Sequence, residues 1–157
     1  MRVHPNCIAI NDILEAAGAA GRVQILAEAA PTAASAAAQV GVEVGAIANS
    51  LIFTTAAGDP LLVMTSGAHR VDTTTVAALV GTASLSRATP EFVLAATGQR
   101  IGGVAPIGHP TPIHTLVDTA LASYPVIWAA GGIPHAVFPT TYDELLALTG
   151  GTPAEVA

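Results

Sequence analysis

Histidine is the residue type in this sequence best suited to acid–base chemistry near neutral pH. Four histidines follow residue 60: His69, His109, His114 and His135. Imidazole exchanges protons near pH 7 and is also a common metal ligand. These four form no i,i+4 helical pair and have no cysteine partner, so their spacing does not favour a zinc site. For each of them, a polar loop position near the surface is the simpler interpretation.

Ser66, His109 and Asp118 have the residue types of a Ser-His-Asp triad. The sequence has no Gly-x-Ser-x-Gly elbow to support it, so we set the triad aside. Asp118 follows an apolar segment. At this position it can orient a loop by hydrogen bonds or cap the helix expected at 119–122, and the two roles are compatible. Cys7 is the only cysteine, so no internal disulfide forms, and we interpret it as an ordinary thiol.

The segment 98–110 is rich in glycine and proline, with the sequence GQRIGGVAPIGHP. Glycine lets a backbone approach a ligand closely and exposes N–H groups, and Pro106 stiffens the loop. Such a loop can hold a carbonyl group or an oxyanion by main-chain hydrogen bonds alone. A structural turn between a helix and a strand is the simpler interpretation on sequence physics, and both stay open.

Short helices and short apolar strands alternate along the chain to position these residues. The capping signals include Asn11 for the first helix and a Thr141/Glu144 capping box for the last. The patterns predict helices at 11–17, 32–40, 72–79, 89–97 and 141–149, and strands at 23–26, 46–55, 61–65, 84–87, 113–117, 126–130 and 135–138. Hairpins and crossovers are mixed, which predicts an α+β domain on a mixed sheet. No Gly-x-Gly-x-x-Gly follows a strand and no P-loop is present.

The composition fits one folded domain over residues 1–157. Hydrophobic residues make up 52% of the chain and charged residues 10%, which supports a core and argues against disorder. Alanine dominates the mean hydropathy of +0.60, and no long uninterrupted apolar run is present. We therefore expect no membrane span and no signal peptide, and the single cysteine fits a cytoplasmic location.

The charges argue against a nucleic-acid backbone binder. The formal net charge is −6, and the five cationic side chains are all arginines, with no lysine. Proteins that hold phosphates need a basic patch, so DNA binding is not expected and little RNA backbone can be bound. Trp128 lies in a buried-strand pattern, which predicts a core position for it instead of a stacking platform.

Short motifs follow one another in a specific order. They are 32–37 leading to Gly41, 48–53 (ANSLIF), 63–67 (VMTSG), 70–72 (RVD), 97–98 (TG), 102–108 (GGVAPIG), 117–118 (VD), 130–132 (AGG) and 144–149 (ELLALT). This succession resembles the YbaK/prolyl-tRNA-synthetase-associated domain family from about residue 20 to about residue 150. The resemblance implies a single α+β domain, with a curled mixed sheet flanked by short helices.

The resemblance also implies an activity. It is hydrolysis of the ester that joins a wrong amino acid to tRNA, typically tRNA(Pro) carrying a small residue, with no metal or other cofactor. The partner would be the acceptor end of the aminoacyl-tRNA, and a synthetase that presents the tRNA stays open. The attacking water would be positioned with help from the ribose hydroxyl of the substrate, which is catalysis by proximity.

The site residues implied by the resemblance follow from the matching motifs. A Gly-x-x-x-Pro loop places the aminoacyl carbonyl and maps onto 102–106, or equally onto 103–108. Catalytic positions are Asn49, Gly102, Gly103 and Pro106. Substrate-binding positions are Ser50, Ser66, Gly67, Gly108, His109, Asp118, Gly131 and Gly132. Alanine at Gly102 or Gly103 is expected to impair ligand handling more than folding.

Asn49 departs from the family pattern. The family usually has a lysine directly before Ser-Leu-x-Phe, and an asparagine supplies only neutral hydrogen bonds where lysine supplies a charge. The departure leaves three alternatives: weaker activity, a different substrate, or a non-catalytic module that binds an aminoacyl-adenosine-like ligand or a protein partner. Arg70 is one cation that could replace the lysine in space.

Overall fold

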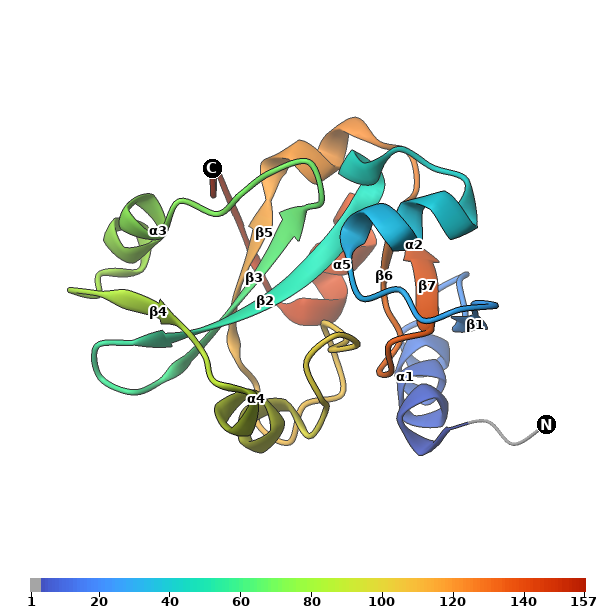
Figure 1. Cartoon of the computed structure of the whole chain (residues 1–157), viewed down its shortest axis with the longest axis horizontal. Helices are drawn as coiled ribbons and strands as arrows, with labels where there is room; N and C mark the ends of the chain where they lie inside the picture. Colours follow the sequence, from blue (N-terminus) through green and yellow to red (C-terminus); the bar gives the residue numbers. More distant parts are fainter. Residues whose placement is uncertain (1–3) are drawn as a thin grey trace.

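A long hairpin forms the centre of the structure, a computed structural model that describes residues 4–157 (Figure 1). The hairpin joins β2 (Ile47–Thr55) to β3 (Pro60–Ser66). Gly58, at φ 85°, turns the chain between them, as its neighbours Asp59 and Pro60 predict. β3 is apolar along most of its length because both of its faces are buried.

The other strands extend this hairpin into one mixed sheet. The order is β1-β7-β6-β2-β3-β5-β8, and β4 pairs separately with β2. The added strands are β1 (Gln24–Ile25), β4 (Leu85–Arg87), β5 (His114–Asp118), β6 (Ile127–Ala130), β7 (Ala136–Thr140) and β8 (Thr152–Ala154). β5 runs parallel to β3, and β6 runs parallel to β2. β3 and β4 pair with β2 in antiparallel fashion, and β7 pairs with β6 in the same way. The predicted α+β mixed sheet is confirmed.

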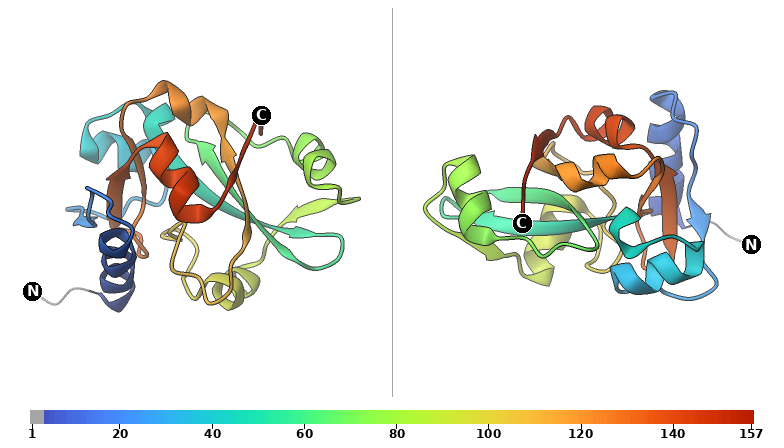
Figure 2. Two further views of the ribbon diagram at one scale, coloured as in Figure 1. Left: turned by 180° about the vertical axis from the view of Figure 1, so that it is seen from behind. Right: turned by 90° about the horizontal axis from the view of Figure 1, so that it is seen from above.

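Five α-helices and two short 3-10 helices of the described chain lie around the sheet (Figure 2). They are α1 (Pro5–Ala16), α2 (Ala33–Val40), α3 (Thr73–Val80), α4 (Pro90–Thr97), α5 (Tyr142–Thr149), η1 (Val44–Ala46) and η2 (Thr119–Ser123). The caps Thr32, Asp72, Thr89 and Thr141 accept backbone N–H groups, as predicted. No helix of residues 4–157 is long and apolar enough to cross a membrane.

The core is divided between the two faces of the sheet, because successive side chains of a strand point to opposite faces. Leu62 and Met64 of β3 pack on one face with Leu14 of α1 and Leu145 of α5. Leu61 and Val63 pack on the other face with Phe53 and with α3 through Val76. A third cluster joins α2 to Ile47 at the start of β2.

Two local expectations were wrong, and one strand was not predicted. The first helix begins at Pro5, because proline fits the first helical turn, and His4 caps it. Asn11 therefore lies inside the helix and does not cap it; its side chain accepts a hydrogen bond from the Val23 N–H. The last helix has only half of its capping box: Thr141 accepts from the Glu144 N–H, but the Glu144 carboxylate accepts from the Thr140 hydroxyl. Strand β8 was missed because Pro153 lies inside it, which only an edge strand tolerates.

Candidate functional site

A cavity of about 370 Å³ lies where the sheet has a gap. One edge of β2 pairs with β3 over its length; the other edge pairs with β6 only at Ile47 and Ala48, and with β4 only from Phe53 onward. In the described structure, no strand pairs with β2 between these two neighbours. The cavity occupies this gap, and its volume falls in the range of small-molecule sites, roughly 300–1,000 Å³.

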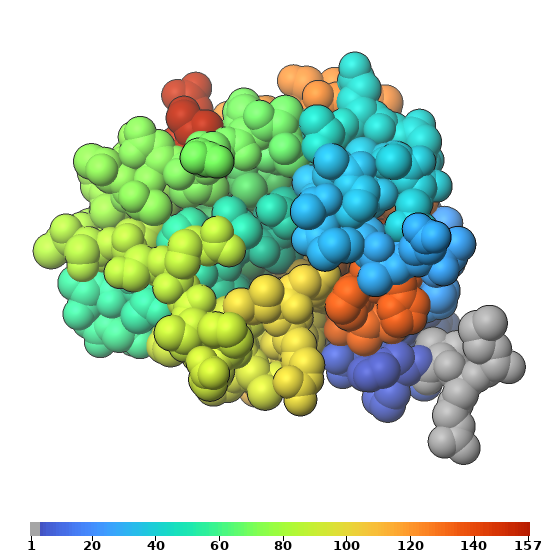
Figure 3. All heavy atoms as spheres, viewed as in Figure 1, coloured from blue at the N-terminus to red at the C-terminus, as the bar shows by residue number. Residues whose placement is uncertain are grey.

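Segments that are distant in the sequence border the gap. They are the turn before α2 (30–33), the middle of β2, the start of the loop 101–104, and the β6–β7 region. Figure 3 shows the blue, yellow and orange surfaces of three of these segments next to one another on one face of the molecule. The site therefore depends on the sheet topology, which brings these segments together.

The lining is mostly small and apolar. Its polar side chains are Thr32, Asn49, Ser50, Arg87 and Trp128. No Asp, Glu, His, Cys or Lys lines the cavity among the described residues. The cavity can therefore orient a ligand by hydrogen bonds and by one positive charge, and it offers no side chain that exchanges protons near neutral pH.

Asn49 is the polar side chain best placed for a ligand. It lies in β2 opposite Thr65 and beside the gap. The side-chain amide forms no hydrogen bond with residues 4–157, whereas Ser50 donates to Sδ of Met64 at 3.3 Å. The Asn49 amide is half-buried and therefore has both a donor and an acceptor available for a bound molecule.

The glycine/proline loop reaches the cavity at its first half only. Residues 101–104 line it, and Pro106 is buried behind them. Gln99, which is 4% exposed, holds the loop: its Oε1 accepts from the Ala105 N–H at 2.6 Å and its Nε2 donates to the Ile107 carbonyl at 3.2 Å. Both bonds are buried, so they fix the loop strongly.

His109 adds a second brace to the same loop. Its Nε2 lies 2.9 Å from the Ala105 carbonyl oxygen and donates to it in the neutral form. Burial lowers the pKa of His109, and the hydrogen bond to Ala105 opposes that shift. His109 stands outside the cavity lining, so its contact with the loop is structural in this arrangement.

The two glycines of the loop have different surroundings. Gly102 has a φ of 99°, and a Cβ atom there would meet only Pro134 Cγ, at 3.9 Å. A Cβ atom at Gly103 would collide with the backbone of Ile133 and Pro134. An alanine at Gly103 would therefore disturb packing, whereas Gly102→Ala costs mainly backbone strain. Alanine at either position was expected to impair ligand handling more than folding, and the close packing of Gly103 argues against this expectation at that position.

Most of the expected substrate-binding residues lie outside the cavity. Of the twelve positions inferred from the sequence, Asn49, Ser50, Gly102 and Gly103 line it. The other eight are Pro106, Ser66, Gly67, Gly108, His109, Asp118, Gly131 and Gly132. Several of these glycines pack closely on other elements: a Cβ atom at Gly108 would meet Ile10 at 2.9 Å, and one at Gly132 would meet Asn6 at 2.9 Å.

Asp118 is buried at the end of β5 and organises a separate cluster that reaches the surface at His69. Its Oδ2 accepts from the Ser66 N–H at 3.0 Å and lies 2.8 Å from Nδ1 of His69. Its Oδ1 accepts from the Ala120 N–H, which is the predicted cap of the following helix. The histidine beside Asp118 is thus His69, and Ser66 donates its hydroxyl to the Gly45 carbonyl, so no triad of Ser66, His109 and Asp118 forms.

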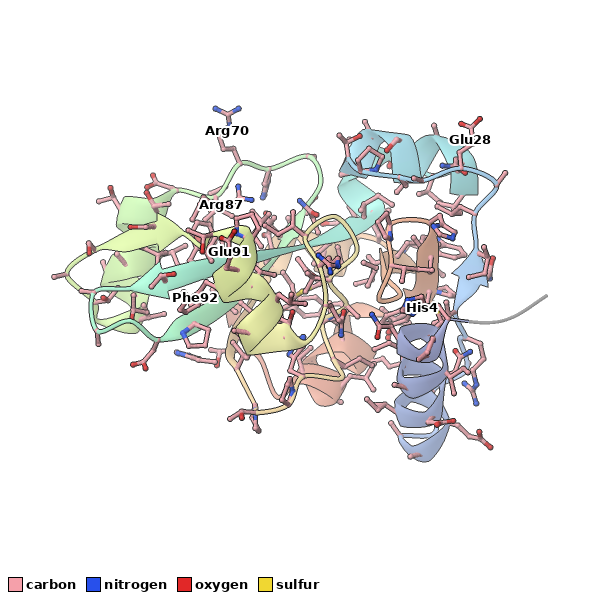
Figure 4. The ribbon with its side chains drawn as sticks, turned by 60° about the horizontal axis from the view of Figure 1, so that its bottom comes forward. His4, Glu28, Arg70, Arg87, Glu91 and Phe92 are labelled. Carbon is pink, nitrogen blue, oxygen red and sulfur yellow. The ribbon has the colours of Figure 1, made fainter. Side chains whose placement is uncertain are left out.

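Sequence reasoning missed three residues of this region. Arg87 and Trp128 line the cavity, and Gln99 supports its loop. Trp128 is half-buried beside Ile47, so the predicted core position holds only in part. Arg70, considered as a replacement for the family lysine, does not line the cavity and extends away from the ribbon in Figure 4.

The fold and the site define an α+β domain with a mostly apolar cavity at a gap in its sheet, lined by a few neutral polar side chains and one arginine. A family model described as the aminoacyl-tRNA editing domain matches residues 27–148. The chain therefore belongs to the aminoacyl-tRNA editing domain family, as its motifs predict. A search of curated proteins returns no match.

Three solved structures have closely similar folds. One, described as a "putative trans-editing enzyme for prolyl tRNA synthetase", is 42% identical, with a TM-score of 0.92, covering 99% of this chain and 98% of its own. A second comes from work on epitope backbone grafting onto scaffold proteins, with 40% identity, a TM-score of 0.91 and 98% coverage of both chains. A third, "hypothetical protein APE2540", is 30% identical, with a TM-score of 0.87, covering 94% of this chain and 98% of its own.

Proposed function

We propose that this protein is a trans-acting deacylase that hydrolyses mischarged aminoacyl-tRNA, with tRNA(Pro) carrying a small amino acid as its substrate. The observation that carries the proposal is that Asn49 and the loop 101–104 line one cavity. The family membership supports the editing reaction, and the 42% identity to a putative trans-editing enzyme for prolyl tRNA synthetase supports a substrate linked to that synthetase.

The cavity lining supports a small aminoacyl group. Its wall contains the alanines Ala30, Ala33, Ala36, Ala48, Ala88, Ala129, Ala130 and Ala136. These small side chains leave a volume of about 370 Å³ for a ligand, and they offer a mostly apolar wall to its side chain. A cysteinyl or alanyl group fits this description in size and polarity.

The proposed mechanism relies on positioning. A water oxygen attacks the ester carbonyl carbon and the ester C–O bond breaks. One proton of the water goes to the ribose oxygen, the other goes to solvent, and the amino acid leaves as a carboxylate. No histidine or carboxylate of residues 4–157 lines the cavity, so the contribution of the protein is to hold the ester and the water in reactive geometry. Loop N–H groups and the Asn49 amide are the donors for the developing oxyanion.

A binding module without catalysis is the second candidate. Asn49 in place of a lysine favours it, as does the absence of an ionisable acid or base from the described lining. Such a module would bind an aminoacyl-adenosine-like ligand, or a protein partner, and release it unchanged.

Deacylation of a panel of mischarged tRNAs separates the two candidates. The panel includes Cys-tRNA(Pro), Ala-tRNA(Pro) and Ser-tRNA, with wild type tested beside Asn49→Ala and Asn49→Lys. We expect turnover of a tRNA(Pro) substrate and a loss of roughly tenfold in kcat/KM with Asn49→Ala, because the variant lacks one hydrogen bond to the substrate. Asn49→Lys should raise the rate, since a charged donor replaces a neutral one.

The folded state of each variant is the control, measured by circular dichroism and thermal unfolding. No turnover of any substrate by a folded wild-type protein would overturn the deacylase proposal in favour of the binding module. Turnover that is unaffected by Asn49→Ala would keep the activity and remove Asn49 from the site.

A further inference from the structure

Arg87 is the single charged side chain among the described residues that line the cavity. The protein as a whole carries a net charge of −6, so its average field repels phosphate groups. A phosphate-bearing ligand that enters this cavity therefore needs a local positive charge. Arg87 lies where that charge would act.

The other arginines of the described chain do not supply it. Arg22 donates Nη1 to the carbonyl oxygens of Ala19 and Gly21, both at 2.7 Å. Arg70 and Arg100 are exposed, as Arg87 is, but they do not line the cavity. Figure 4 shows Arg70 extending away from the ribbon, whereas Arg87 lies near α4.

The exposed side chain of Arg87 lies against an aromatic ring and forms no ion pair within residues 4–157. Arg87 is paired with Phe53 across β4 and β2, and its Cζ lies 5.8 Å from the centre of the Phe53 ring. A ring face attracts the cation but carries no countercharge. Within residues 4–157, no carboxylate lies within 4.0 Å of this guanidinium.

Arg87 and Asn49 share one face of the sheet. Residues 48–54 of β2 pair with β3 without a bulge, so Asn49 and Phe53 point to the same face, and Arg87 opposite Phe53 points there too. Asn49 and Phe53 are four positions apart, roughly 13 Å along the strand. An arginine side chain that reaches from residue 87 toward a bound nucleoside 5′-phosphate would span the distance between Phe53 and Asn49 together with that ligand.

We propose that Arg87 is the anion subsite of this cavity and binds the phosphate that is joined to the 5′ oxygen of the terminal nucleoside of the substrate. The proposal rests on the proposed function for the identity of the ligand. Arginine binds phosphate through paired, charge-assisted N–H···O bonds, which orient the ligand as well as attract it. The nucleotide strand then leaves the cavity over β4, and its ester end lies toward Asn49.

The first test measures binding alone. The protein is titrated with adenosine 5′-monophosphate and, separately, with adenosine, and binding is observed by NMR. Wild type should bind the monophosphate about ten- to a hundredfold more tightly than adenosine. Arg87→Gln should abolish this preference, and Arg87→Lys should keep part of it. Arg70→Gln is the matched control, because it removes the same charge from an exposed site outside the cavity.

The second test uses hydrolysis of two esters, 3′-aminoacyl-adenosine and the same ester with a 5′-phosphate. Arg87→Gln should lower kcat/KM about tenfold or more for the phosphorylated ester only. If no ester is hydrolysed by any variant, the deacylase function fails, and the binding test still decides the role of Arg87. Equal affinity of wild type for the two probes, or an equal effect of Arg70→Gln, would overturn the anion subsite.

Discussion

At the scale of single residues, the site combines an unengaged amide with one unneutralised cation. Asn49 and Arg87 point to one face of the sheet, and neither forms an ion pair or a side-chain hydrogen bond within the described chain. Polar groups inside folded proteins are usually satisfied by other protein groups. Asn49, which is half-buried beside the cavity, therefore has amide groups available for a ligand, and Arg87, which is exposed and lines the same cavity, has an unpaired charge available for one.

His109 gives a prediction about pH and stability. Burial lowers its pKa in the folded protein, so the unfolded chain takes up more protons as the pH falls below about 6.5. The stability present above that pH is therefore lost progressively toward the lower, folded-state pKa. His109→Gln keeps an N–H donor for the Ala105 carbonyl but does not titrate.

The measurement is urea unfolding at a series of pH values between about 7 and about 5. The free energy of unfolding of His109→Gln should fall less over this range than that of wild type. Identical slopes for the two proteins would mean that His109 is protonated in the folded state as easily as in the unfolded chain, against the structural argument.

At the scale of elements, the loop 99–109 is positioned by its own buried side chains. Gln99 satisfies one N–H and one carbonyl group, and Thr97 accepts the Gln99 N–H while donating to the Val93 carbonyl of α4. The loop is thereby attached to the end of α4 on one side. Gly103 attaches it to the β6–β7 turn on the other, since a Cβ atom there would collide with that backbone.

Gln99→Ala should destabilise the protein and impair the site together. The substitution leaves the Ala105 N–H and the Ile107 carbonyl without partners, which costs about 1–3 kcal/mol for each group. Thermal and urea unfolding report the stability, and the affinity for a non-hydrolysable aminoacyl-adenosine analogue reports the site. Gln99→Glu is a second variant: it keeps an acceptor for the Ala105 N–H but places a buried carboxylate oxygen against the Ile107 carbonyl, so it should also destabilise the protein at neutral pH.

A stability of Gln99→Ala equal to that of wild type would mean that water or a loop shift replaces both hydrogen bonds. If Gln99→Ala is less stable but binds the analogue as tightly as wild type at a temperature where it is folded, the hydrogen bonds of Gln99 stabilise the loop without affecting the ligand site.

At the scale of the whole molecule, the charge distribution limits what the protein can hold. The net charge is −6, and the chain has five arginines and no lysine. Binding of a tRNA body needs several phosphate contacts, each supplied by a cation. With Arg87 as the single charge at the cavity among residues 4–157, we expect recognition to be confined to the acceptor end.

A comparison of full-length aminoacyl-tRNA with an acceptor-stem minihelix checks this expectation. We predict that kcat/KM for the two substrates agrees within roughly a factor of three at physiological salt. A minihelix that reacts far more slowly would show that the tRNA body is bound, by a surface that the charge distribution does not reveal. An effect that appears only after addition of a synthetase would assign that binding to the synthetase.

Much of the fold follows from the sequence because its signals are local. Threonine and aspartate caps, glycines in the left-handed region and apolar runs of strand length predict α2, α3, α4 and the central hairpin with nearly the observed bounds. Strand β8 escaped because its pairing with β5 is a long-range contact and Pro153 argues against a strand. Family membership was predictable because motif order is itself a property of the sequence.

The site was only partly predictable, because the gap in the sheet has no local signature. The sequence determined that Asn49 and the glycine loop were candidates, and that no lysine was available. Tertiary structure alone decided that β4 and β6 pair with the two ends of the same edge of β2 and leave a cavity between them. That pairing joins segments far apart in the chain, so the position of Arg87 at the cavity depends on strand register and not on its sequence neighbours.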